Sequence, residues 1–344
     1  MPQIELGSGD LLDRRGRLAE AGWARKEARR YDRAAIAASP LRIKEWDYYC
    51  VLAGDYGLSA VVADNGYMGF LSVVWLDFRT PSVTVESVIT PFPLGRMRMP
   101  GSADAGDIVQ DHPKLKLAFR HTPGGRRLTI DCPGFAKGKG LSGVIDLAQP
   151  PMDRMMIATP WRDAPKAFYY NQKINCMAAS GEVVLGGETY AFQPDRAFAV
   201  LDWGRGVWTY RNTWYWGSAS GLVEGKPFGF NIGYGFGDTS AASENMVFHE
   251  GVAHKLDQVT FHLPPASAAG TYDAAPWRFS SNDGRLEMTF EPIMDRAETT
   301  DLKVIRSITH QVFGRFSGTA ILDDGRKVAF KDLLGFAEKV ENAW

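Results

Sequence analysis

Two charged residues interrupt an aromatic stretch that runs from residue 198 to residue 238, and they are the first candidates for chemistry. Asp202 and Arg205 lie in this stretch. Burying a charge costs several kcal/mol unless the charge is paired. The pattern therefore indicates either a structural ion pair or a functional site. Four of the ten tryptophans belong to the same stretch: Trp203, Trp208, Trp214 and Trp216.

A carboxyl group at Asp202 would suit proton transfer to an apolar substrate. Desolvation in an aromatic pocket raises the pKa of a carboxyl group, which can then act as a general acid near neutral pH. Neighbouring indole and phenol rings can stabilise a carbocation through their quadrupoles. We expect Tyr210 and Asn231 to join Asp202 by holding water or substrate. We predict ligand contacts from Trp203, Trp208, Trp214, Trp216, Tyr234, Asn171, Lys173 and Arg205.

The alternative for Asp202 is a purely structural role. An ion pair with Arg205 or Arg211 would keep its carboxylate ionised and would join the two halves of the chain. The nearness of arginine in the sequence favours this role over the catalytic one. Asp238 and Glu244 are further candidates for an acid, although Thr239, Ser240 and Ser243 around them indicate a solvated loop.

The elements that position these residues must be strands, because side chains alternate between the two faces of a strand. After the turn at 224–225, one face carries Phe228, Phe230, Ile232, Tyr234 and Phe236. The other face carries Asn231 and four glycines, at positions 229, 233, 235 and 237. Glycines inside a strand mark the close approach of a ligand or of another backbone. The bare face therefore either leaves a cavity inside a barrel or lets a neighbouring sheet or helix pack closely.

Two other segments carry unusual composition. Asn171, Gln172, Lys173 and Asn175 form a polar cluster that either orients a ligand or satisfies backbone groups at a strand end. The loop from residue 90 to residue 111 contains three prolines between positions 91 and 100, so it cannot be a central strand. We expect it to be a cover over a barrel end or a binding lid.

Recurrent turn signals between β-prone runs predict an all-β fold. Asn65-Gly66 is the strongest of them, because tight hairpin turns need positive φ. The spacing favours two antiparallel up-and-down barrels. We expect an irregular lead-in over 1–40, a first barrel over 41–207 and a second over 208–344. Apolar residues at helical spacing predict a short C-terminal helix over 331–343.

Net charge and composition limit the classes of protein to which this chain can belong. A net charge of −1 gives no general attraction to nucleic acid or to anionic membranes, and no run approaches a membrane span. Three scattered cysteines fit a reducing cytoplasm better than a disulfide framework. Scattered histidines and the lack of a phosphate-binding loop predict a protein that needs no metal and no cofactor.

Specific motifs resemble known families. Residues 202–206 (DWGRG), 230–238 (FNIGYGFGD), 169–176 (YYNQKINC) and 310–314 (HQVFG) are similar to a bacterial family known only as a domain of unknown function. A more distant resemblance is to the tandem-lipocalin group of carotenoid hydratases and AttH-like proteins, with tocopherol cyclase as a looser relative. That group implies two lipocalin-like (calycin) barrels and protonation of an alkene by an acid in an aromatic cavity. The histidine that often follows its aspartate is Trp203 here.

We therefore expect a protein that binds a hydrophobic, isoprenoid or lipid-like small molecule. It would act on that molecule by acid catalysis, as a hydratase, cyclase or isomerase. The alternative is a carrier or lipid-binding protein without chemistry. The sequence leaves the ligand and the oligomeric state open.

Overall fold

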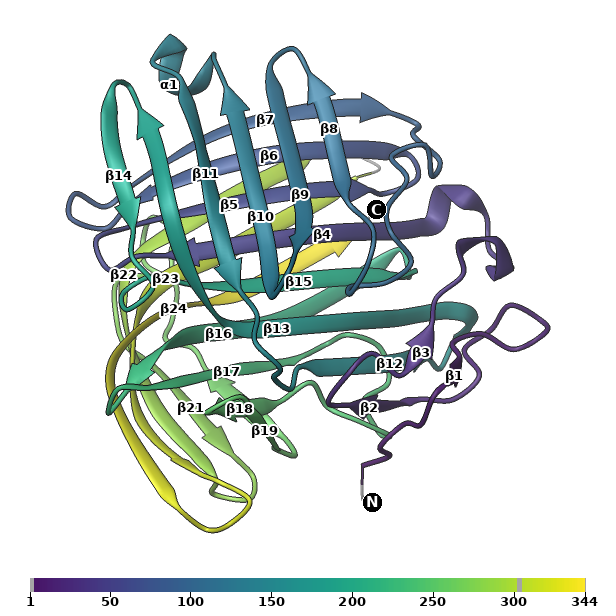
Figure 1. The fold of residues 1–344 in the computed structure, drawn as a ribbon. Helices are drawn as coiled ribbons and strands as arrows, with labels where there is room; N and C mark the ends of the chain where they lie inside the picture. The colour runs from purple at the N-terminus through teal and green to yellow at the C-terminus, as the bar shows by residue number, and fades with distance from the viewer. Residues whose placement is uncertain (1–2, 302–304, 344) are drawn as a thin grey trace.

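The computed structural model describes residues 3–301 and 305–343 and is built almost entirely of antiparallel strands in two large sheets (Figure 1). The first sheet has 13 strands, with the order β7-β6-β5-β4-β15-β13-β11-β10-β9-β8 and with β12, β14 and β2 attached at the side. Its strands are β2 (Gly22–Ala24), β4 (Ile43–Leu52), β5 (Tyr56–Asp64), β6 (Met68–Asp77), β7 (Ser82–Pro91), β8 (Ile108–His112), β9 (Leu115–Thr122), β10 (Gly125–Cys132), β11 (Leu141–Ala148), β12 (Met155–Trp161), β13 (Ala164–Leu185), β14 (Glu188–Phe192) and β15 (Phe198–Val207).

The second sheet has nine strands in the order β19-β18-β17-β16-β24-β23-β22-β21-β20. The chain changes sheet between β15 and β16. The nine strands are β16 (Arg211–Val223), β17 (Lys226–Tyr234), β18 (Met246–His249), β19 (Val252–Lys255), β20 (Val259–His262), β21 (Trp277–Ser281), β22 (Leu286–Asp301), β23 (Arg306–Ile321) and β24 (Lys327–Ala343).

The remaining elements are short. β1 (Gly9–Asp10) and β3 (Arg29–Arg30) form a small parallel pair, and β2 joins the first sheet by pairing with β12. Two 3₁₀ turns, η1 (Arg33–Ala35) and η2 (Pro40–Arg42), and the helical turn α1 (Phe135–Gly138) complete the described chain. No helix among the described residues has the length and apolar character needed to cross a lipid bilayer.

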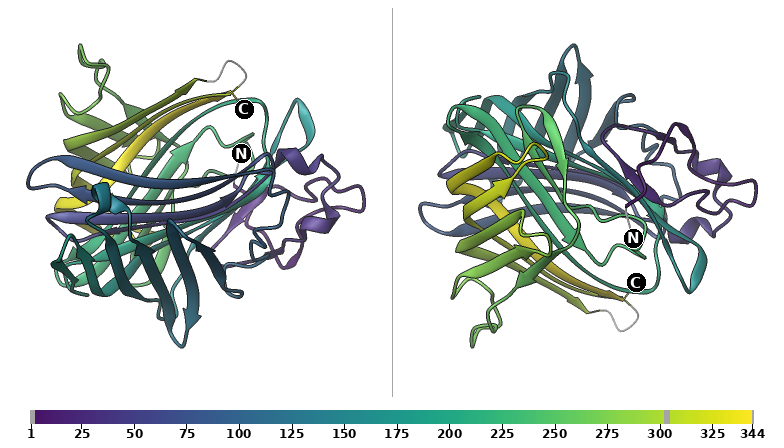
Figure 2. Two further views of the ribbon diagram at one scale, coloured as in Figure 1. Left: turned by 90° about the horizontal axis from the view of Figure 1, so that it is seen from above. Right: turned by 90° about the horizontal axis from the view of Figure 1, so that it is seen from below.

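Both sheets are strongly curled, as Figure 2 shows from above and below. Each has a core of its own. The first core includes Tyr49, Leu117 and Trp203, and the second includes Phe230, Phe279 and Phe316. Among residues 3–301 and 305–343, neither sheet pairs its two edge strands with each other. The expected all-β antiparallel fold is thus confirmed, and its two units are curled half-barrels.

A third apolar cluster lies between the two half-barrels. Tyr169, Trp208 and Val200 contribute to it from the first half of the chain, and Trp216 and Phe336 contribute from the second. Because successive residues of a strand face opposite sides, each central strand supplies one set of side chains to its own core and the other set to this interface. The half-barrels therefore pack through their outer faces.

The expected C-terminal helix is wrong, since β24 is a central strand between β16 and β23. Leu333 and Ala337 belong to the second core, whereas Phe336 belongs to the interface cluster and Leu334 packs against it. A strand that is buried on both faces carries apolar residues without strict alternation. In the sequence, apolar residues distributed in this way have the spacing expected of a helix, which explains the wrong prediction.

The loop after β7 covers the concave side of the first half-barrel. The backbone carbonyl of Pro100 accepts hydrogen bonds from Arg205, and that of Ala103 accepts one from Arg126. Asp64, at the end of β5, accepts a 2.7 Å hydrogen bond from the backbone N–H of Gly95. These contacts make the segment a cover, one of the two roles expected for it.

Candidate functional site

An aromatic cavity with a volume of about 200 Å³ lies between the half-barrels. Its walls come from β4, β5, β13 and β15 on one side and from β16 and β24 on the other (Figure 1). This cavity lies outside the cores of both half-barrels. The glycine face of β17 therefore does not line a cavity inside a barrel. The lining residues are Lys44, Trp46, Val61, Ala63, Asn65, Tyr169, Lys173, Asp202, Trp208, Trp214, Trp216, Phe236 and Glu338.

Asp202 is held in a compact polar group at the cavity wall. Lys173 Nζ lies 2.8 Å from Asp202 Oδ1, and Asn171 Nδ2 donates a 2.6 Å hydrogen bond to the same oxygen. Lys173 is 1% exposed, and its ammonium lies 3.7 Å from the centre of the Trp216 ring. The pairing partner of Asp202 is therefore Lys173, and not Arg205 or Arg211 as the sequence suggested.

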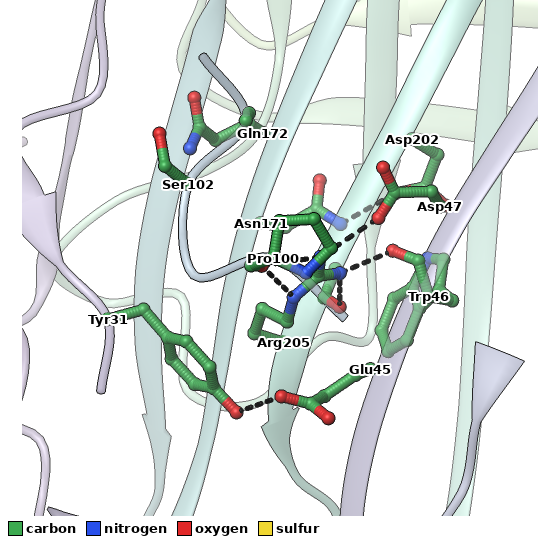
Figure 3. A network of polar contacts seen from close by, with 12 residues as sticks. Tyr31, Glu45, Trp46, Asp47, Pro100, Ser102, Asn171, Gln172, Asp202 and Arg205 are labelled. Atoms are coloured by element: carbon green, nitrogen blue, oxygen red, sulfur yellow. Dashed lines mark hydrogen bonds and ion pairs between the residues drawn. The ribbon is translucent and has the colours of Figure 1, made fainter. Parts of the chain in front are cut away.

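Strand alternation explains why Arg205 cannot reach Asp202. The two residues are three positions apart on β15, so their side chains leave opposite faces of the strand. Arg205 lies in the first half-barrel, where its Nη2 donates a 2.9 Å hydrogen bond to Asp47 Oδ1 and its Nη1 donates one to the carbonyl of Trp46 (Figure 3). Trp203 lies on the same inner face, 4.0 Å below the Arg205 guanidinium. Neither residue lines the cavity.

Close packing explains why the D-W-G-R-G motif has glycine at positions 204 and 206. Gly204 and Gly206 share the cavity face of β15 with Asp202. A Cβ at Gly204 would lie 2.0 Å from the Trp46 ring, and one at Gly206 would lie 2.4 Å from the carbonyl of Phe168. The bare backbone of β15 therefore lets the aromatic wall lie close to the strand.

Three of the four predicted tryptophans form that aromatic wall. Trp208 packs edge-on against Trp46 and Trp214, with ring centres 5.8 Å and 5.3 Å apart. Trp216 packs against Phe336 at 4.8 Å. These contacts fix the rings in place around the cavity, as a preformed ligand site requires.

Asn231 stands one layer behind the wall. Its Oδ1 accepts a 2.7 Å hydrogen bond from Trp216 Nε1, and its Nδ2 donates to the backbone carbonyl of Glu244. Tyr234 packs on Tyr215 and Phe261 in the second half-barrel. Tyr210 is 48% exposed after the end of β15. These three predicted residues are not brought to the cavity.

The bare face of β17 turns toward the first half-barrel. A Cβ at Gly229 would lie 2.7 Å from Cys176 Sγ of β13. Close packing of a neighbouring sheet, one of the two expected roles, is therefore the reason for this glycine. Phe236 does not share a face with Phe230, because β17 ends at Tyr234 and Gly235, with φ +96°, redirects the chain.

The solvated loop expected around Asp238 and Glu244 holds only for the first of them. Asp238 pairs with the exposed Arg162 at 2.6 Å, which lowers the pKa of Asp238 to about 2. Glu244 is 1% exposed, and burial raises its pKa to about 7 against the opposing effect of Lys173. Glu244 therefore belongs to the buried interface, next to Asn231.

Glu338 is the acid that sequence reasoning missed. It lines the cavity from β24, where Trp214 Nε1 donates 2.8 Å to its Oε1 and Gln311 Nε2 lies 3.2 Å from its Oε2. Burial raises the pKa of Glu338 to about 7, although the Trp214 hydrogen bond and Lys173 act in the opposite direction. A strand assignment for 327–343 could have found it, as an isolated acid on an apolar strand face.

The arrangement contains proton donors but no metal cluster. In the described ranges, no three His, Cys, Asp or Glu side chains come together as ion ligands. Tyr169 lines the cavity, and within those ranges its hydroxyl has no hydrogen-bond partner. Burial raises the pKa of Tyr169 well above its ordinary value, so this hydroxyl stays protonated. The cavity thus offers a weak acid, a phenol donor and an aromatic wall.

Solved structures share this tandem half-barrel architecture. A putative AttH from Nitrosomonas europaea is 16% identical with a TM-score of 0.57, over 90% of this chain and 95% of that one. CghA with Sch210972 is 11% identical with a TM-score of 0.54, over 98% and 97%. Kievitone hydratase from Nectria haematococca is 10% identical with a TM-score of 0.50, over 88% of each chain. At these identities the likeness shows the lipocalin-like tandem fold alone.

Sequence comparison gives the family. No curated protein matches the sequence. A family model described as a domain of unknown function (DUF2804) matches residues 3–344, which include both half-barrels and all the cavity residues. The chain therefore belongs to the DUF2804 family.

Proposed function

We propose that the protein binds a hydrophobic, isoprenoid or lipid-like small molecule between its half-barrels and protonates it, as a hydratase, cyclase or isomerase. The observation that carries this proposal is Glu338, a buried carboxyl group in an aromatic cavity whose pKa is raised to about 7. A general acid is most effective when its pKa lies near the operating pH. Glu338, rather than Asp202, is thus the proton donor.

The other cavity groups have defined roles in this scheme. Asp202 neutralises Lys173 in their 2.8 Å ion pair, so the pair adds no net charge beside a developing cation. Trp208, Trp214 and Trp46 present ring faces and edges to the cavity, and their quadrupoles can stabilise positive charge. The Tyr169 hydroxyl can donate to an oxygen of the substrate or to an attacking water.

The size of the cavity limits the enclosed part of the substrate. An apolar cavity of ~150 Å³ holds a benzene molecule, whereas drug-sized sites reach ~300–1,000 Å³. At about 200 Å³, this cavity encloses one ring or a short branched chain. A longer isoprenoid would place only its reacting end there.

Two proteins with a similar fold provide a precedent for a small-molecule function. One similar structure is named as a hydratase, and another was solved with the small molecule Sch210972. Both belong to proteins of low identity, so the reaction and the substrate of this chain rest on its own cavity.

Deuterium incorporation tests the proposal even when the product is unidentified. Protonation of an alkene in D₂O places deuterium on carbon, which mass spectrometry detects. We expect incorporation into a C10 alkene such as limonene or myrcene, with a rate that falls as pH rises through about 7, as Glu338 loses its proton. Glu338→Gln should lower the rate by ~100-fold or more, the usual contribution of a general acid.

Glu341→Gln is the matched control. Glu341 lies on the same strand but is exposed and paired with Lys339 at 2.8 Å, so this variant should react as the wild type does. An unchanged rate in Glu338→Gln would refute the assignment of the acid.

A non-catalytic carrier is the second candidate. It is favoured by the hydrogen bonds that already reach both carboxyl oxygens of Glu338, which also suit a structural group. Native mass spectrometry of protein from its own host, together with no deuterium incorporation into any alkene offered, would support a carrier: the retained molecule would then be bound unchanged.

A further inference from the structure

Lys44 is a cavity residue that the proposed acid catalysis does not use. It lies on β4, two positions before Trp46, so the two side chains share the face that meets the second half-barrel. On the neighbouring strand its register partner is Gly206, which has no side chain to cover it. Lys44 is 4% exposed and lines the cavity.

The surroundings of the Lys44 amine are unusual for lysine. Its Nζ donates a 2.7 Å hydrogen bond to the backbone carbonyl of Asn65, which also lines the cavity, and lies 4.1 Å from the centre of the Tyr67 ring. Burial, with a further contribution from Arg42, lowers the pKa of Lys44 to about 7, although Asp64 opposes the change. A large fraction of this amine is therefore neutral and nucleophilic at neutral pH.

The second lysine of the cavity behaves differently. Lys173 Nζ lies 2.8 Å from Asp202 Oδ1 in a buried ion pair, and its side chain is held over the Trp216 ring. Lys173 is therefore a structural member of an ion pair, and Lys44 is the candidate nucleophile of the cavity.

We propose that Lys44 captures an aldehyde or ketone carried on a small apolar skeleton, as an imine formed inside the cavity. This proposal rests on the hydrophobic guest of the proposed function, but it does not require Glu338. The Lys44 nitrogen forms a bond to the carbonyl carbon, and one N–H proton passes to the carbonyl oxygen to give a carbinolamine. Loss of that hydroxyl group with the remaining N–H proton releases one water and leaves the neutral C=N bond.

Reductive trapping of the full-length protein tests this site. The probe is benzaldehyde, whose ring matches the size of the cavity, with sodium cyanoborohydride at pH 7, and peptide mass spectrometry locates the adduct. We expect the adduct at Lys44 to exceed that at an exposed lysine such as Lys327 by at least about tenfold, because an ordinary lysine is almost wholly protonated at this pH.

Lys255 is the matched control for reactivity without a cavity. Burial also lowers its pKa to about 7, but it lies on β19 and does not line the cavity. Toluene, an unreactive guest of the same size, should suppress labelling of Lys44 and leave labelling of Lys255 unchanged. Equal labelling of the two lysines, or labelling of Lys44 that toluene does not reduce, would overturn the proposal.

Two variants separate this proposal from the acid mechanism. Lys44→Arg keeps a cation at the position but forms no imine, and Lys44→Met removes the charge, so each should lose the adduct. Glu338→Gln should keep it. In the wild type, an adduct at Lys44 without deuterium incorporation would support Lys44 and refute the acid mechanism. Deuterium incorporation without an adduct at Lys44 would support the acid mechanism and refute the capture by Lys44.

Discussion

At the scale of single residues, breaking the buried Lys173–Asp202 pair should lower stability strongly. Both side chains are almost fully buried, and the separation of 2.8 Å leaves no room for water between them. Removing one member of a buried pair leaves the other charge without compensation, which costs ~3–5 kcal/mol. We expect Asp202→Asn to lower the free energy of unfolding by about this amount, as measured by urea unfolding followed through tryptophan fluorescence.

Asp146→Asn provides the comparison for this variant. Asp146 pairs with Arg127 at 2.7 Å, but both side chains are about half exposed, so water screens the pair and its loss should cost only a small fraction of the effect of Asp202→Asn. Replacing both members of the buried pair, as in Lys173→Met with Asp202→Leu, should recover part of the lost stability. Wild-type stability in Asp202→Asn would contradict the structural role assigned to the pair.

Among the elements, the end of β17 decides what faces the cavity. Gly235 has φ +96°, and a Cβ there would lie 2.1 Å from the carbonyl oxygen of Thr213. This glycine turns the chain so that Phe236 stacks on Tyr169 with ring centres 4.9 Å apart. The strand end thus places one wall of the cavity.

Gly235→Ala should therefore be far more disruptive than alanine at an open turn. Gly225, at the other end of β17, also has positive φ, but a Cβ there meets nothing within 4 Å. We expect Gly225→Ala to cost ~1–2 kcal/mol from the left-handed backbone alone, and Gly235→Ala to cost clearly more. Thermal unfolding of the two variants checks this difference, and equal shifts in Tm would show that the close contact is unimportant.

Across the molecule as a whole, burial of ionisable groups between the half-barrels makes stability depend on pH. The pKa values of Glu244 and Glu338 are raised to about 7, so the folded state holds their protons more tightly than the unfolded state does. Their contribution is complete below the ordinary pKa near 4.5 and is lost as pH rises through about 7. Each group contributes a decrease of up to ~1.4 kcal/mol per pH unit in that window.

The difference between the wild type and Glu338→Gln isolates one of these contributions. We expect the free energy of unfolding of the variant to fall less steeply between pH 5 and pH 7, as measured by urea unfolding at each pH. The lysines act in another window: the pKa values of Lys44 and Lys255 are lowered to about 7, so their contribution grows as pH rises from about 7 toward 10. Parallel profiles for the wild type and Glu338→Gln between pH 5 and pH 7 would contradict the raised pKa of Glu338.

Local order along this chain follows from the amino-acid sequence alone. Alternation from residue 228 to residue 234 identifies a strand, and Asn65-Gly66 identifies a hairpin turn, in which Gly66 has φ +78°. Asp202 and Arg205 are three residues apart on one strand. Their spacing in the sequence is therefore enough to place the two side chains on opposite faces. Aromatic composition also indicated that a cavity wall lies near Trp208, Trp214 and Trp216.

Which faces meet is a property of the folded molecule. Lys44 and Glu338 are nearly 300 positions apart in the sequence, yet both line the cavity with Asp202 because β4, β15, β16 and β24 are brought together by two separate sheets and their interface. Alternation is a property of each strand alone, whereas the packing of outer faces depends on the apolar surface that both sheets bury together. For that reason the sequence led us to consider a cavity inside a barrel, whereas the folded protein has its cavity between the two half-barrels.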